Sequence, residues 1–177
     1  MSELFSIQLQ NRQQQGRDGV WLDLPTTTEQ VQAALRQIGI SSDNPQGLFI
    51  SGYFAEEEKR FAIPYNMVLA SNVDELNFLA SRLETLSTGE RAELNAALQA
   101  PQSELFSIGR ITDFPENVDY YVHLPDVHGP AQLGDYYLNR SGMVDMPEEW
   151  KGGIDTAQFG RYVAQQEQGV FTEYGYL

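Results

Sequence analysis

Apolar and polar positions in the first 60 residues follow the periods of two strands, one helix and a third strand. Residues 4–9 alternate apolar and polar side chains, which is typical of a half-buried strand. A second short strand over residues 20–24 is stopped by Pro25, and residues 31–39 carry apolar side chains at helical spacing. With a third strand over residues 48–54, this order predicts a compact α+β unit.

The middle of the chain changes to a helical period. Residues 73–86 place their apolar side chains on one helical face, and Asn72 with Glu75 has the spacing of an N-terminal capping pair. A second helix follows and ends at Pro101. The two helices together predict a helical hairpin within residues 67–100.

After this hairpin the pattern returns to a mixture of strands and helices. The predicted elements are a strand over residues 120–124, a helix between Pro130 and Gly142, a helix capped by Asp155 and stopped by Gly169, and a strand over residues 170–176. The predicted fold class is therefore α+β. We expect three small subdomains: an α+β part over residues 1–66, a helical part over 67–108 and an acidic α+β part over 109–177.

The composition excludes several classes of protein. The chain has 177 residues, 41% of them hydrophobic, and no cysteine, so it can build a core but no disulfide and no thiolate site. Its apolar runs are far shorter than the ~20 residues of a membrane span. The first residues lack the basic and apolar regions of a secretion signal, so we expect a cytoplasmic protein.

The strongest functional signal in the composition is charge. The chain has 25 Asp and Glu against 11 Lys and Arg, a formal net charge of −14. Such a surface repels nucleic-acid phosphates and anionic lipid headgroups, so we expect cationic partners, no direct nucleic-acid binding and no membrane partner.

The excess of acid is greatest over residues 111–149, which we call the acidic stretch. Arg140 is the one basic residue of this stretch. Its acids are Asp113, Glu116, Asp119, Asp126, Asp135, Asp145, Glu148 and Glu149. Aromatic and apolar residues lie between them, which indicates that the carboxylates sit on a folded scaffold rather than in a solvated run.

The two histidines do not have the spacing of a metal site. His123 and His128 are five positions apart, which directs them to opposite faces of a strand, and Pro125 between them excludes one helical face. The sequence also contains no nucleophile elbow, phosphate-binding loop or dinucleotide-binding glycine motif. We therefore expect no catalytic residue, no metal and no cofactor.

Paired carboxylates are the one feature typical of an enzyme. Glycosidases need two positioned acids, and Asp113 with Glu116 or Glu148 with Glu149 provides such a pair. A chain with 25 acids contains neighbouring pairs by chance. A carboxylate-dependent hydrolase and a general acidic adaptor for a basic partner are therefore two functions that these residues leave open.

Four segments, in order along the chain, resemble the ArdA family of antirestriction proteins. They are Gly-Val-Trp-Leu-Asp-Leu-Pro at 19–25, Asp-Glu-Leu-Asn-Phe-Leu-Ala at 74–80, Gln-Leu-Gly-Asp-Tyr-Tyr-Leu at 132–138, and the Phe-Gly-Arg and Phe-Thr-x-x-Gly-Tyr motifs within 154–177. The basic, Gln-rich segment at 10–17 departs from the family pattern. Each segment alone is weak, but four in the right order make a specific match.

The resemblance implies an antirestriction protein of mobile genetic elements that mimics DNA. Members of the family are elongated three-part dimers that place carboxylates where a duplex has phosphates. They occupy the DNA-binding groove of type I restriction–modification enzymes, at the methyltransferase core. On this resemblance, the eight acids of the acidic stretch are candidate phosphate mimics. Two chains of −14 carry the charge of roughly 48 Å of duplex, about 14 base pairs.

The resemblance also implies a homodimer, for which the sequence offers aromatic contact residues. Phe106, Tyr120 and Tyr121 are candidate dimer contacts. Packing in the core of a single chain is the alternative for each of them, because buried aromatic side chains dominate core energetics as well as interfaces.

Overall fold

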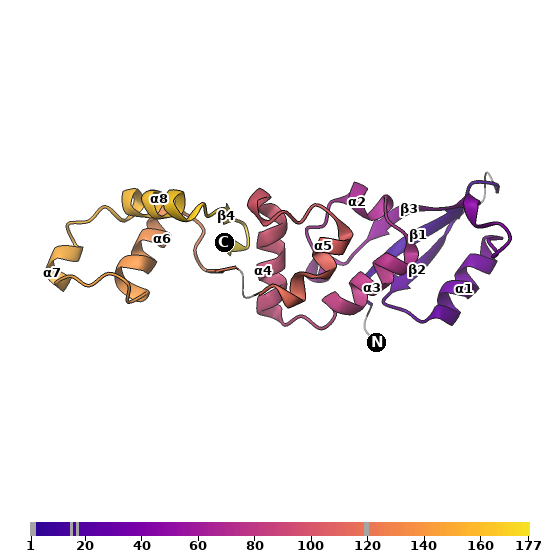
Figure 1. The fold of residues 1–177 in the computed structure, drawn as a ribbon, viewed down its shortest axis with the longest axis horizontal. Coiled ribbons are helices and arrows are strands. Elements are labelled where there is room, and N and C mark those ends of the chain that lie inside the picture. The colour runs from indigo at the N-terminus through magenta and orange to yellow at the C-terminus, as the bar shows by residue number, and fades with distance from the viewer. Residues whose placement is uncertain (1–2, 15, 17, 119–120) are drawn as a thin grey trace. The chain divides into compact units, whose positions relative to one another are not determined.

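The computed structural model describes residues 3–14, 16, 18–118 and 121–177, and it is a mixed α+β structure (Figure 1). This confirms the predicted fold class. Contacts divide the chain into two compact units. Unit 1 comprises Met1–Ser87 and Leu105–Pro115, and unit 2 comprises Thr88–Glu104 and Glu116–Leu177. The three subdomain boundaries given above remain a prediction.

Unit 1 contains a three-stranded antiparallel sheet in the order β2-β1-β3 (Figure 1). Its strands are β1 (Phe5–Asn11), β2 (Val20–Leu24) and β3 (Leu48–Phe54). Alternate residues of β1 are buried, as the apolar–polar alternation predicts. Phe5 pairs with Leu24 of β2, and a bulge between Gln8 and Leu9 shifts the register of β1 against β3.

Helices of unit 1 supply the rest of its core. They are α1 (Thr28–Gln37), α2 (Tyr65–Leu69), α3 (Val73–Leu83) and α5 (Ile108–Thr112). The strand–strand–helix–strand order is therefore confirmed. The Asn72 side chain accepts a hydrogen bond from the backbone N–H of Glu75 at 2.9 Å, which confirms the predicted cap of α3. The buried side chains of α3 include Leu76, Leu79 and Leu83.

One residue of α3 also fixes the loop between β2 and α1. The side-chain oxygen of Asn77 accepts from the backbone N–H of Thr26 at 2.8 Å, and its Nδ2 donates to the Thr26 carbonyl at 3.0 Å. This loop includes the cis peptide bond Leu24-Pro25. The segments 19–25 and 74–80, which carry half of the family resemblance, are therefore neighbours in unit 1.

Unit 2 is mainly helical and closes with a short hairpin. Its elements are α4 (Thr88–Gln99), α6 (Pro130–Asp135) with a π-helical turn (Tyr136–Arg140), α7 (Glu148–Lys151), α8 (Thr156–Glu167), β4 (Phe171–Thr172) and β5 (Gly175–Tyr176). Val127, Leu133 and Tyr176 form a buried hydrophobic cluster in this unit. Asp155 caps α8 by accepting from the backbone N–H groups of Ala157 and Gln158, as predicted.

The predicted strands of this part are wrong in detail. Among the described residues of 120–124, only Leu124 pairs, through two backbone hydrogen bonds with Tyr176 of 2.8 and 3.0 Å. The single strand expected over 170–176 is a two-stranded hairpin, because Gly175 takes a φ of +110° and the Thr172 hydroxyl donates to the Gly175 carbonyl. The chain therefore reverses where a continuous strand was expected.

Candidate partner-binding surface

The scaffold that carries most of the acidic stretch depends on two glycines. A Cβ at Gly134 of α6 would lie 1.8 Å from the carbonyl oxygen of Thr156. A Cβ at Gly160 of α8 would lie 1.8 Å from the carbonyl oxygen of Pro130. Backbone therefore packs directly on backbone where α6 contacts α8, and only glycine leaves room for it. These glycines belong to the Leu-Gly and Phe-Gly-Arg segments that carry the family resemblance.

A carboxylate held by two tyrosines joins this helix pair to the hairpin. Glu167, the last residue of α8, accepts hydrogen bonds from the hydroxyls of Tyr137 at 2.5 Å and Tyr176 at 2.8 Å, one on each carboxylate oxygen. Burial, together with these hydrogen bonds, raises the pKa of both tyrosines above its ordinary value. Glu167 itself is exposed to solvent. It was not among the predicted phosphate mimics.

All the predicted carboxylates that the structure describes are exposed. These are Asp113, Glu116, Asp126, Asp135, Asp145, Glu148 and Glu149. Asp119 lies outside the described residues. Asp113 ends α5 in unit 1, whereas the other six belong to unit 2. The acidic stretch is therefore one run in sequence but is divided between two compact units.

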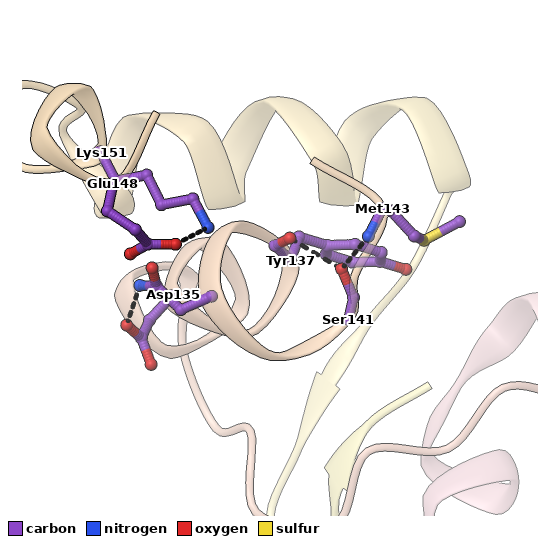
Figure 2. Close-up of polar contacts among 7 residues, drawn as sticks. Asp135, Tyr137, Ser141, Met143, Glu148 and Lys151 are labelled. Carbon is purple, nitrogen blue, oxygen red and sulfur yellow. Dashed lines mark hydrogen bonds and ion pairs between the residues drawn. The ribbon is translucent and has the colours of Figure 1, made fainter. Parts of the chain in front are cut away.

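Some of these carboxylates are held by neighbouring side chains (Figure 2). Asp135 accepts a hydrogen bond from the Nδ2 of Asn139 at 2.8 Å, one helical turn further along. The Lys151 Nζ lies 2.9 Å from the Oε1 of Glu148. The side chain of Lys151 is 14% exposed and that of Glu148 is 83% exposed, so the lysine anchors the pair while the carboxylate faces solvent.

The segment between α6 and α7 is ordered by a serine. The hydroxyl of Ser141 donates to the carbonyl of Tyr137 at 2.7 Å and accepts from the backbone N–H of Met143 at 3.2 Å (Figure 2). The backbone N–H of Ser141 also bonds the carbonyl of Tyr136 at 2.8 Å, which closes the π-helical turn. These bonds fix the chain that leads toward Asp145.

The candidate dimer contacts differ in their surroundings. Phe106 belongs to unit 1 and is 68% exposed. Tyr121 belongs to unit 2, and its hydroxyl donates to the Ser103 carbonyl at 3.3 Å. Burial, with the charges of Glu104 and Glu93, raises the pKa of Tyr121. Tyr120 lies outside the described residues. Of the two described candidates, Phe106 is the more exposed.

The histidines support the closing hairpin, a role that the sequence did not reveal. The Nε2 of His123 lies 2.7 Å from the carbonyl oxygen of Tyr174, and the Nδ1 of His128 lies 3.3 Å from that of Thr172. A carbonyl oxygen only accepts, so each ring nitrogen is the donor. Within the described part of the chain, no group of three or more His, Cys, Asp or Glu is placed to hold a metal ion.

These features define an acidic α+β protein that presents its carboxylates to solvent on helical and loop segments. The sequence matches the family model for the antirestriction protein ArdA over residues 15–177, nearly the whole chain. The chain therefore belongs to the ArdA family of antirestriction proteins, and the resemblance is confirmed. That description names an antirestriction protein and no catalytic activity. A comparison with individually curated proteins finds no match. No helix in the described ranges has both the length and the apolar character to cross a membrane.

Proposed function

We propose that this antirestriction protein acts as a DNA mimic. Its exposed carboxylates take the place of duplex phosphates, and a homodimer occupies the DNA-binding groove of a type I restriction–modification enzyme at the methyltransferase core. One observation carries the proposal: every described acid of the acidic stretch is exposed, although aromatic and apolar residues alternate with the acids along the sequence. Some apolar side chains nearby, such as Leu133 and Leu138, are buried, whereas Val122, Met143 and Trp150 are exposed together with the charges.

The charge is unequally divided between the two compact units, in agreement with this proposal. Unit 2 contains 13 Asp and Glu against four Lys and Arg, a net charge of −9 over its 79 residues. Duplex DNA carries one charge per about 1.7 Å, so −9 corresponds to roughly 15 Å of duplex. Unit 1, with 12 acids and seven bases, has a net charge of −5. We infer that unit 2 provides the larger part of the mimicking surface.

Fixed carboxylates suit this role better than mobile ones. DNA gains binding free energy by releasing its condensed counterions, and a protein with fewer charges gains less from this source. A protein competitor must compensate by losing less conformational freedom when it binds. The contacts of Asp135 with Asn139 and of Glu148 with Lys151 restrict two of the carboxylates before any partner arrives.

Competition with DNA tests the proposal. Purified protein is added to a type I restriction–modification enzyme, and DNA binding by the enzyme is measured at increasing salt. We expect the protein to reduce DNA binding at low salt and to lose potency as salt rises, because the exposed charges are screened. Full DNA binding at low salt in the presence of excess protein would contradict the proposal.

The surroundings of the paired acids do not support the alternative function as a hydrolase. A catalytic acid needs a pKa raised by burial or by a close like charge. Both members of each candidate pair, Asp113 with Glu116 and Glu148 with Glu149, are exposed. The acidic adaptor differs from the mimic only in its partner, and the competition experiment separates the two.

A further inference from the structure

Unit 2 contains a pocket that the proposed surface of exposed carboxylates does not use. It has a volume of about 400 Å³ and lies between the turn that follows α4, the end of α8 and the last residues of the chain. That volume is within the range of ligand-binding pockets. Its apolar lining comes from Ala100, Val122, Val170 and Leu177. Val122 is 67% exposed, so an apolar wall of the pocket is open to solvent.

The polar side of this pocket has one carboxylate among the neutral side chains of Gln102, Ser103 and Gln168. Glu167 lines it and is held by the hydroxyls of Tyr137 and Tyr176. A carboxylate offers about four acceptor positions, so two remain for a ligand. Tyr121 also lines the pocket, and Glu93 and Glu104 are near enough to affect its ionisation. None of the described residues that line the pocket is Lys or Arg.

A pocket with an apolar lining and a carboxylate favours a ligand that has both an apolar part and a cationic group. An anion is repelled by Glu167, and a purely apolar group makes no hydrogen bond to the acceptor positions of Glu167 that the two tyrosines leave open. The side chains of Lys and Arg have an apolar stem and a cationic head, and they cover apolar surface while the head remains hydrogen-bonded. Arg adds two parallel N–H groups that match a carboxylate.

We propose that this pocket receives one Lys or Arg side chain of the partner protein, with its stem against Val122 and Val170 and its head on Glu167. The inference rests on the proposed function, since an enzyme that binds DNA offers basic side chains to a mimic. The pocket would add one specific contact, at Glu167, to a surface whose other carboxylates act together through their electrostatic field.

A probe titration tests the pocket without the enzyme. Methyl resonances of Val122 and Val170 are followed by NMR while n-butylguanidinium is added to the intact protein at low salt, with n-butanol as the neutral probe. We expect saturable shifts with the cation, small shifts with the alcohol, and about tenfold weaker cation binding in Glu167→Gln. Glu173→Gln makes the same change of charge outside the pocket lining and should bind the cation like the parent.

Equal cation binding by the parent and Glu167→Gln, in a protein with unchanged thermal unfolding, would overturn the inference. Glutamine keeps an acceptor for one tyrosine hydroxyl, so the local contacts are largely preserved. Shifts spread over the whole surface, without saturation, would count against the pocket as well.

Inhibition of a type I enzyme tests the occupant. Val122→Trp fills the mouth of the pocket from an exposed position. This variant and Glu167→Gln, tested separately, should each raise the concentration for half-inhibition about tenfold. Inhibition by the parent that neither variant weakens would refute the inference and leave the proposed function intact. Absence of inhibition by the parent would refute the proposed function, and the probe titration would still decide the pocket. Conversion of a dimer to a monomer by Val122→Trp would assign the pocket to a second copy and overturn the inference.

Discussion

At the scale of single residues, the positions that sequence reasoning could not identify are those whose role depends on a distant neighbour. Glu167 is one acid among 25, and nothing in the local sequence indicates that Tyr137 and Tyr176 converge on it. The exposure of the acidic stretch was easier to anticipate, because unpaired carboxylates are costly to bury. The histidines likewise bond carbonyl groups more than 40 positions away.

The first prediction concerns the glycine contact between α6 and α8. Gly160→Ala places a Cβ against the carbonyl of Pro130, where backbone on both sides limits adjustment, so we expect a loss of about 3 kcal/mol in the free energy of unfolding. Urea unfolding measures it. Gly89→Ala is the matched control, because a Cβ at Gly89 in α4 meets no atom within 4 Å, and alanine there should leave stability unchanged or raise it by about 1 kcal/mol. Equal stability of the two variants would show that α6 and α8 do not pack through this glycine.

The second prediction concerns the tyrosines that bond Glu167. Their pKa is raised from 10.0, so the stability that they contribute is complete below pH 10 and is lost as pH rises through the raised pKa. Ultraviolet absorbance of tyrosinate should show a late group of tyrosines that ionise well above pH 10 in the parent. Glu167→Gln removes the anion beside both hydroxyls and should move this group to lower pH. Glu173→Gln removes the same charge elsewhere in unit 2, and a shift as large in this control would exclude a local effect.

At the scale of elements, the strands of the sheet and the long helices were predictable, and the shortest helices were not. The patterns that predict β1, β2, β3, α1, α3, α4 and α8 span five to twelve residues and include recognisable caps or stops. The helices α2, α5 and α7 have only four or five residues each. Helices this short are not stable alone and depend on the packing around them, which a local pattern does not contain. The hairpin at the end was missed because its turn depends on Gly175.

The third prediction concerns the cap of α8. Asp155 accepts from two backbone N–H groups, at 3.0 and 3.1 Å, so Asp155→Ala should lower the free energy of unfolding by about 1 kcal/mol. Asp155→Asn retains the acceptor and should lose much less, which separates the cap from the charge. Thermal unfolding of both variants measures the difference. If the asparagine variant loses as much as the alanine variant, the stabilisation comes from charge at the helix N-terminus instead.

At the scale of the whole molecule, the composition shows that the net charge is negative, and the fold decides which compact unit carries each charged residue. The sequence places eight acids in 39 residues, yet contacts assign Asp113 to unit 1 and the following acids to unit 2. This division follows from which segments pack together, and a count of charges along the chain does not contain that information.

The fourth prediction concerns the distributed charge. Conversion of five carboxylates of unit 2 to amides should weaken inhibition of a type I enzyme by about 0.2–1 kcal/mol per charge, because each exposed acid contributes a small part of the field. The set is Asp126, Asp135, Asp145, Glu148 and Glu149. Potency should fall gradually as the substitutions accumulate, and the dependence of inhibition on salt should become shallower.

A matched set in unit 1 controls for the net charge. It comprises Asp18, Asp43, Glu56, Glu57 and Glu58, which are all exposed. We expect this variant to remain the more potent of the two. A complete loss from one unit 2 substitution in a folded protein would instead indicate a single local site, and equal losses from the two sets would indicate that only total charge matters.

The glycine contact between α6 and α8 has a consequence for protein engineering. Gly134 and Gly160, which lie in segments that carry the family resemblance, make the backbone contacts between α6 and α8 and carry no charge. The exposed acids can therefore be moved, exchanged or neutralised while the contacts that hold the two helices remain. Unit 2 is thus a scaffold whose exposed charges can be redesigned by substitution, and the variants can be tested for binding to the basic DNA-binding grooves of other enzymes.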